Sequence, residues 1–130
     1  MILETSFLID LLKGEEKIDK WIEKLDSNEE IPILNPITAM KLWEGVHLSD
    51  RTEDELEKIK SLLKGLNFEN FDIKDGKLSG KINADLTKEG EKIDIEDVMI
   101  ASIAINSNQS VLTGNPDHFN RIERIEVETY

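Results

Sequence analysis

Two groups of carboxylate side chains in this sequence could hold a divalent metal ion. Glu4 is the first, because it directly follows the apolar run Met1–Leu3. Asp94 and Asp97 form the second, at the entrance to a segment that is apolar on almost every side. Carboxylate oxygens are the ligands that hard cations such as Mg²⁺ prefer. An acid that leads into a buried helix lies near the core, where a carboxylate usually has a partner or binds a metal.

A third polar group follows the apolar run from Ser110 to Thr113. It consists of Thr113, Asn115 and Asp117, with His118 beside them. We expect His118 to be exposed on a loop, and the two histidines of the chain are too isolated to suggest a metal triad. Each of the three groups also has a structural interpretation, respectively a surface acid near a helix dipole, ordinary helix capping, and turn formation.

Short apolar runs alternate with amphipathic helices along the chain. Strands are expected at residues 1–3, 31–34, 66–71, 110–113 and 125–128. Helices are expected at residues 7–12, 15–25, 38–48, 52–64, 72–88 and 95–105. Thr5 and Ser6 offer an N-cap to the first helix, and Ser27-Asn28 breaks the second. This order predicts a small, mainly parallel sheet between two layers of helices, with right-handed crossovers.

Composition indicates one folded domain over residues 1–130. The chain is 38% hydrophobic and 34% charged, and it has no cysteine, which excludes a disulfide framework and a thiolate metal site. No apolar run approaches the roughly 20 residues that span a bilayer. The first ten residues carry no basic segment, so we expect no signal peptide and a cytoplasmic location.

The net charge of −12 limits the partners of the chain. A nucleic-acid backbone is bound by Lys and Arg, so nonspecific attraction to it is small here. Metal ions or a basic partner would have to offset the repulsion. In open α/β sheets ligands bind outside the carboxyl ends of the strands, which is where the polar groups above are expected.

Four segments of the chain resemble the PIN domain family, in the same order and spacing. They are Met1–Asp10, Ile37–Gly45, Asp97–Ala101 and Thr113–Phe119. The resemblance covers essentially the whole chain. The compact size and short loops are most similar to the VapC toxins of toxin–antitoxin pairs. The resemblance implies a PIN-like three-layer α/β/α sandwich and a ribonuclease dependent on Mg²⁺ or Mn²⁺. It also implies a homodimer that a VapB-like antitoxin inhibits.

The resemblance also implies a site, and the sequence departs from the family pattern in two places. The implied metal ligands are Glu4, Asp97 and Asp117, and the implied lining residues are Thr5, Ser6, Lys41, Asp94, Thr113 and Asn115. Glu4 stands where the family has Asp, which lengthens the arm by one methylene. Lys41 stands where the family has a helical Glu, so a carboxylate ligand is replaced by an ammonium.

Three outcomes are open for Lys41. It can turn outward on its long stem, it can leave the role of the missing carboxylate to Glu44 one turn along the helix, or it can pair with Glu4 or Asp97 in place of a metal. Two functions follow, a VapC-type ribonuclease impaired by Glu4 and Lys41, or a catalytically inactive PIN-fold module that dimerises or binds an antitoxin. A phosphohydrolase with Glu4 as nucleophile is disfavoured, because no Asp-x-Asp pair follows the first strand.

Three aromatic side chains are candidates for a partner surface. Phe7, Trp21 and Trp43 each lie on or near an apolar helical stripe. We expect Phe7 in the core, and the pattern leaves both tryptophans open between core and interface. A basic antitoxin segment would suit the negative charge of the chain.

Overall fold

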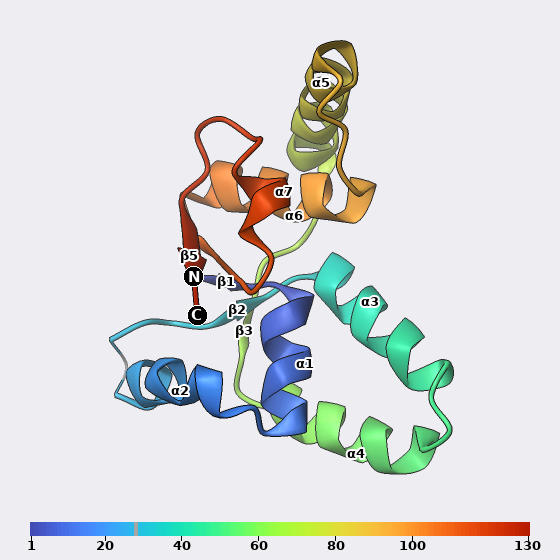
Figure 1. Ribbon diagram of the computed structural model, residues 1–130, viewed down its shortest axis with the longest axis vertical. Helices are drawn as coiled ribbons and strands as arrows, with labels where there is room; N and C mark the ends of the chain where they lie inside the picture. Colours follow the sequence, from blue (N-terminus) through green and yellow to red (C-terminus); the bar gives the residue numbers. More distant parts are fainter. Residues whose placement is uncertain (28) are drawn as a thin grey trace.

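A parallel sheet forms the centre of the protein. The computed structural model describes residues 1–27 and 29–130. In this part of the chain the sheet has five strands in the order β3-β2-β1-β4-β5, and every neighbouring pair is parallel (Figure 1). The strands are β1 (Ile2–Leu3), β2 (Ile33–Leu34), β3 (Asn67–Phe68), β4 (Val111–Thr113) and β5 (Val127–Thr129).

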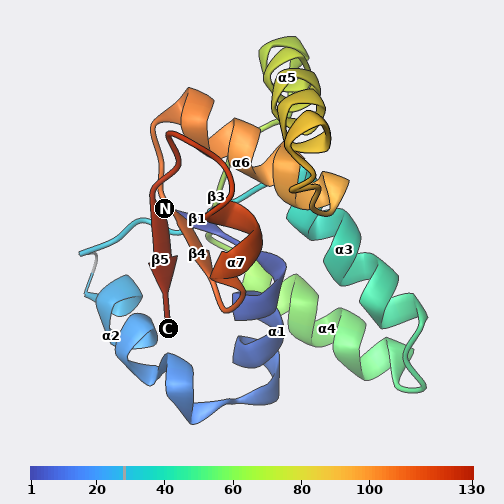
Figure 2. The same cartoon turned by 45° about the horizontal axis from the view of Figure 1, so that its top comes forward.

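Helices cover both faces of the sheet. They are α1 (Thr5–Lys13), the 3₁₀ turn η1 (Glu16–Ile18), α2 (Asp19–Asp26), α3 (Pro36–His47), α4 (Thr52–Leu63), α5 (Ile73–Glu89), α6 (Ile95–Ser107) and α7 (Pro116–Phe119). Figure 2 shows α6 and α7 beside β4 and β5, with α5 beyond α6. None of the helices in the described ranges is both long and apolar enough to span a bilayer.

Alternate strand residues separate the core into two clusters. Side chains of successive strand residues point to opposite faces of a sheet. Ile2, Ile33 and Val111 accordingly pack with residues of α5, α6 and α7. Leu3, Leu34 and Leu112 pack with residues of α1, α2, α3 and α4. The α/β/α sandwich predicted from the sequence is therefore confirmed.

Three local predictions needed correction. The strand expected at residues 66–71 is only Asn67–Phe68, because it lies at an edge of the sheet and both of its residues are exposed. The helix expected at residues 15–25 divides into η1 and α2. The segment after β4, expected as a loop, forms the one-turn helix α7, which begins with Pro116 and buries Phe119. Proline favours the first turn of a helix because its missing N–H needs no partner there.

The break predicted after the second helix is only partly described. Ser27 is the C-cap of α2, whereas Asn28 lies outside the described residues. Phe7 is fully buried, as expected. Trp21 is also buried, at 7% exposure, and its indole N–H donates to the Thr129 carbonyl at 3.3 Å. Trp43 is half-buried and packs against the same cluster.

Candidate metal centre

The carboxyl ends of β1 and β4 meet at the centre of the sheet. Leu3 and Leu112 are paired in the register of these two strands. Glu4 follows β1 directly, and Thr113 is the last residue of β4. The Thr113 hydroxyl donates to Glu4 Oε2 at 3.1 Å, so the sheet brings together these two residues, which are 109 apart in the chain.

The Glu4 carboxylate is buried and strongly hydrogen-bonded. Its side chain is only 5% exposed. Besides Thr113, its Oε2 accepts from the Ser6 backbone N–H at 3.0 Å and from the Ser6 hydroxyl at 2.5 Å. Glu4 is therefore itself the N-cap of α1, a role that the sequence had suggested for Thr5 and Ser6. The carboxylate folds back onto its own helix and also accepts from Thr113, which ties α1 to the end of β4.

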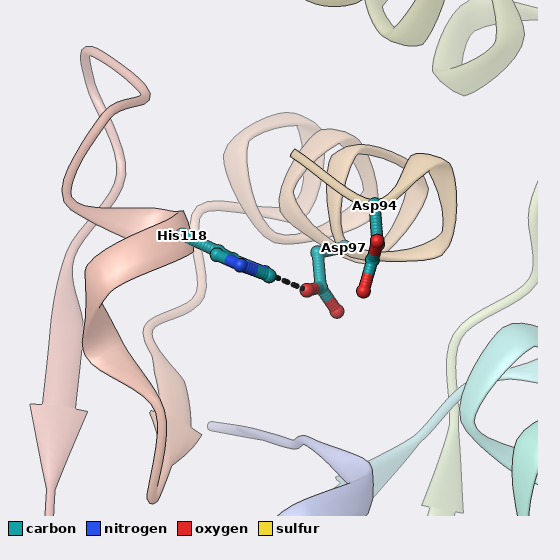
Figure 3. Close-up of side chains that lie close together, drawn as sticks. All are labelled: Asp94, Asp97 and His118. Atoms are coloured by element: carbon teal, nitrogen blue, oxygen red, sulfur yellow. Dashed lines mark hydrogen bonds and ion pairs between the residues drawn. The ribbon is translucent and has the colours of Figure 1, made fainter. Parts of the chain in front are cut away.

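A second cluster lies at the start of α6. Asp94 is the N-cap of α6, and Asp97 lies in its first turn with 5% exposure. His118 of α7 places its Nδ1 2.7 Å from Asp97 Oδ2. One ligand atom from each of Asp94, Asp97 and His118 lies within 4.8 Å of the others. Figure 3 shows the two carboxylates pointing away from α6 and the imidazole reaching Asp97 from α7.

His118 is the residue of this cluster that the sequence prediction missed. It was expected on an exposed loop, but it is half-buried and bonded to Asp97. The available signal was Pro116, which favours a helix start. Successive residues of a helix point about 100° apart, so a helix at this place separates the direction of His118 from that of Asp117.

Lys41 is the lysine that forms an ion pair with Asp97 in the described part of the chain. Its Nζ lies 3.7 Å from Asp97 Oδ1, and its side chain is 25% exposed. This distance is an ion pair but exceeds the usual 2.7–3.2 Å of an N–H···O hydrogen bond. Of the three outcomes open from the sequence, the pairing with Asp97 is the one observed.

The remaining residues of the predicted site lie around these two clusters. Asp117, Asn115 and Glu44 are exposed, and none of them belongs to the group formed by Asp94, Asp97 and His118. Thr5 is buried, and its hydroxyl has no hydrogen-bond partner in the described part of the chain. Glu4 also lies outside that group. The roles that the sequence suggested for these residues stay predictions.

The donor set fits a divalent cation. Two carboxylates and an imidazole offer oxygen and nitrogen ligands to a single ion, and they come from two packed helices. The positive charge of Lys41 opposes that cation, because two unit charges about 4 Å apart interact by roughly 4 kcal/mol at an effective dielectric constant near 20. The centre can therefore hold a metal ion once the ammonium moves away.

Comparison with known proteins agrees with this fold. The family described as PIN domain matches residues 1–125. The chain belongs to the PIN domain family. Ribonuclease VapC of Rickettsia bellii is 33% identical to it, over 99% of this chain and 95% of its own length.

Two solved structures resemble this PIN domain closely. A chain of VapBC2 from Rickettsia felis, bound to a DNA fragment from their promoter, superposes with a TM-score of 0.90 at 26% identity, covering 99% of this chain and 97% of its own. A chain of DNA-bound VapBC from Salmonella typhimurium gives 0.88 at 27% identity, covering 98% of this chain and 96% of its own.

Tyr130 packs against the segment that follows β4. A Cβ atom at Gly114 would lie 2.6 Å from the Tyr130 hydroxyl oxygen, so the absence of a side chain at Gly114 makes room for the phenol. The hydroxyl donates to Asp10 Oδ2 at 2.7 Å, and the ring meets Phe7 edge-on at 5.3 Å. Burial raises the pKa of the phenol further above its usual range, so Tyr130 is protonated at neutral pH.

Tyr130→Phe is expected to lower the free energy of unfolding by about 1 kcal/mol at pH 7, because it removes one hydrogen bond to a carboxylate. Burial alone would raise the pKa of Asp10, but the hydrogen bonds from Lys17 and Tyr130 outweigh it and lower the pKa below 3.8. A lowered pKa of Asp10 stabilises the folded state at pH values above the pKa of Asp10 in the unfolded chain. This stabilisation is lost as the pH falls through the lower pKa that Asp10 has in the folded chain. The difference between Tyr130→Phe and the unchanged chain should therefore shrink below about pH 4, as measured by urea denaturation.

The control for this prediction is the Asp10→Asn background. There the carboxylate is absent at every pH, so Tyr130→Phe should have a smaller and pH-independent effect. An equal loss of stability in both backgrounds would show that the phenol acts through something other than Asp10.

Proposed function

We propose that this PIN domain is, over its whole length as one unit, a metal-dependent endoribonuclease of the VapC type and the toxin of a toxin–antitoxin pair. The observation that carries the proposal is Asp97, a buried carboxylate beside Asp94 and His118 at the carboxyl end of a parallel sheet. The 33% sequence identity to Ribonuclease VapC of Rickettsia bellii supports RNA cleavage as the reaction.

In the proposed reaction, the carboxylates of Asp94 and Asp97, with His118 beside them, would hold a divalent ion such as Mg²⁺ or Mn²⁺. The bound ion would supply positive charge and an activated water for attack on a phosphodiester of RNA. Glu4 fixes the start of α1 to the end of β4 through its hydrogen bonds from Ser6 and Thr113. Asp97 holds His118 in one orientation through the 2.7 Å contact.

The proposed partners follow from the relatives. The similar chains from Rickettsia felis and Salmonella typhimurium were solved as VapBC complexes, which supports a VapB-like antitoxin as partner. The net charge of −12 suits an antitoxin with a basic segment. We also propose that the chain forms a homodimer and acts in the cytoplasm, as the resemblance to VapC toxins suggests.

One contact favours a second function. Lys41 lies 3.7 Å from Asp97, where its ammonium can neutralise the carboxylate in place of a metal ion. In that case the chain would be a PIN-fold binding module that engages an antitoxin without cutting RNA.

Asp97→Asn tests the proposed reaction. Removing a residue that hydrogen-bonds to a metal ligand typically costs about 10–100-fold in metal affinity or activity. Removing the ligand itself should therefore lower RNA cleavage by at least about 100-fold. Cleavage of a labelled RNA would be followed with Mg²⁺, with Mn²⁺ and with EDTA. The matched control is Asp54→Asn, an exposed aspartate in the first turn of α4. Cleavage that survives EDTA or Asp97→Asn would overturn the metal mechanism.

A further inference from the structure

The ligand set at the start of α6 is mixed rather than all-oxygen. Asp94 and Asp97 offer carboxylate oxygens, and His118 offers an imidazole nitrogen. We propose that this centre binds a first-row transition ion such as Mn²⁺ or Zn²⁺ in preference to Mg²⁺, with His118 as a direct nitrogen ligand. The inference rests on the metal-dependent function proposed above and assigns the ligands and the class of metal.

The geometry of Asp97 and His118 is close to that of two ligands on one ion. Adjacent ligands of an octahedral ion, about 2.1 Å from the metal and at right angles to each other, lie about 3 Å apart. Asp97 Oδ2 and His118 Nδ1 are 2.7 Å apart, so an ion that bound both atoms would release the proton they share to solvent and widen their separation by a few tenths of an ångström. Asp94 lies within 4.8 Å and can complete the set with a change of side-chain rotamer.

The two helices that carry these ligands are firmly held. Asp97 is 5% exposed in α6, whose next residue, Val98, is fully buried. His118 precedes Phe119, which is 1% exposed and packs into the same cluster as α6. The ligands are therefore positioned by the core before any ion arrives, which lowers the cost of binding.

Nitrogen ligation discriminates between metals. Mg²⁺ is a hard cation that binds oxygen ligands and keeps several of its waters. Imidazole suits transition ions better, and the affinity of a mixed nitrogen and oxygen site rises along the first-row series from Mn²⁺ to Cu²⁺. A centre with one imidazole among three ligands should thus favour Mn²⁺ over Mg²⁺, and Zn²⁺ more strongly.

Lys41 opposes a bound cation by its charge, but it pairs with a different Asp97 oxygen from the one that His118 contacts. Its Nζ faces Asp97 Oδ1, whereas His118 contacts Oδ2 of the same carboxylate. The lysine is a quarter exposed, so its stem can carry the ammonium into solvent when a cation binds.

The direct test is the nitrogen coupling of bound Mn²⁺, measured by pulsed electron paramagnetic resonance on the full chain without a histidine tag. The chain has two histidines, and His47 is exposed at the end of α3, which makes His47→Gln a matched control. We expect ¹⁴N coupling in the unchanged chain and in His47→Gln, and its loss in His118→Gln. Coupling that is absent from the unchanged chain, or that survives in His118→Gln, overturns the proposal.

Calorimetry supplies a second measurement. Mn²⁺ should bind at least tenfold more tightly than Mg²⁺, and His118→Asp, which replaces the nitrogen ligand with an oxygen ligand, should reduce the ratio of the two affinities. Equal affinities in the unchanged chain, or no binding of Mn²⁺, would refute the inference. Mg²⁺-supported RNA cleavage without nitrogen coupling would refute it while leaving the ribonuclease intact. Nitrogen coupling without RNA cleavage by any metal would uphold it and refute the ribonuclease.

Discussion

Lys41→Glu is expected to raise the affinity of this PIN domain for Mn²⁺ at least tenfold and to increase metal-dependent RNA cleavage. The substitution removes the ammonium that lies 3.7 Å from Asp97 and adds a carboxylate in its place. One opposing unit charge about 4 Å away corresponds to roughly 4 kcal/mol at an effective dielectric constant near 20. Since Lys41 can turn outward when a cation binds, the substitution should recover only part of this energy. The expected tenfold gain in affinity corresponds to about 1.4 kcal/mol.

Lys58→Glu is the matched control for this change. Lys58 and Lys41 line the same groove of about 460 Å³ between α1, α3 and α4, but Lys41 is the lysine paired with Asp97 in the described part of the chain. Lys58→Glu makes the same change in net charge, so it measures the general effect of charge on cation binding. Calorimetry and RNA cleavage would be compared across the three proteins.

The results for Lys41→Glu distinguish the two proposed functions. An inactive unchanged chain together with an active Lys41→Glu variant would show that the ammonium silences the site. Strong and equal metal-dependent cleavage by both would show that Lys41 does not impair the ribonuclease. If Lys58→Glu reproduced the full gain in affinity, the pairing of Lys41 with Asp97 would not be its cause.

Phe7→Ala should lower the free energy of unfolding by about 3–5 kcal/mol, the usual cost of removing a buried phenylalanine ring. Phe7 is fully buried in the cluster that joins α1 to the sheet, and its ring contacts Tyr130 edge-on. The loss includes the transfer of the ring from water and the cavity left behind. Urea denaturation followed by circular dichroism would measure it.

Phe68→Ala provides the comparison for Phe7. Phe68 lies on the edge strand β3 and is 61% exposed, so its removal should change the stability by no more than about 0.5 kcal/mol. A loss of similar size at both positions would contradict the assignment of Phe7 to the core and of Phe68 to the surface.

The sequence by itself determined the fold and located two acids that the structure buries, Glu4 and Asp97. Apolar runs alternating with amphipathic helices require parallel strands joined by crossovers, and the observed sheet has only parallel pairs. Glu4 was located because it ends an apolar run, and Asp97 because it leads into the apolar helix α6. Both signals are local, since each depends on residues next to the acid in the chain.

Only the tertiary structure decided which side chains surround Asp97. Lys41 and His118 are 56 and 21 residues away from it in the sequence, and they reach it because α3 and α7 end up beside α6. The direction of His118 depends on whether the chain after β4 forms a helix, and the burial of Phe119 accompanies that helix. Contacts of this kind between distant side chains depend on how whole helices pack, which no short pattern of residues encodes.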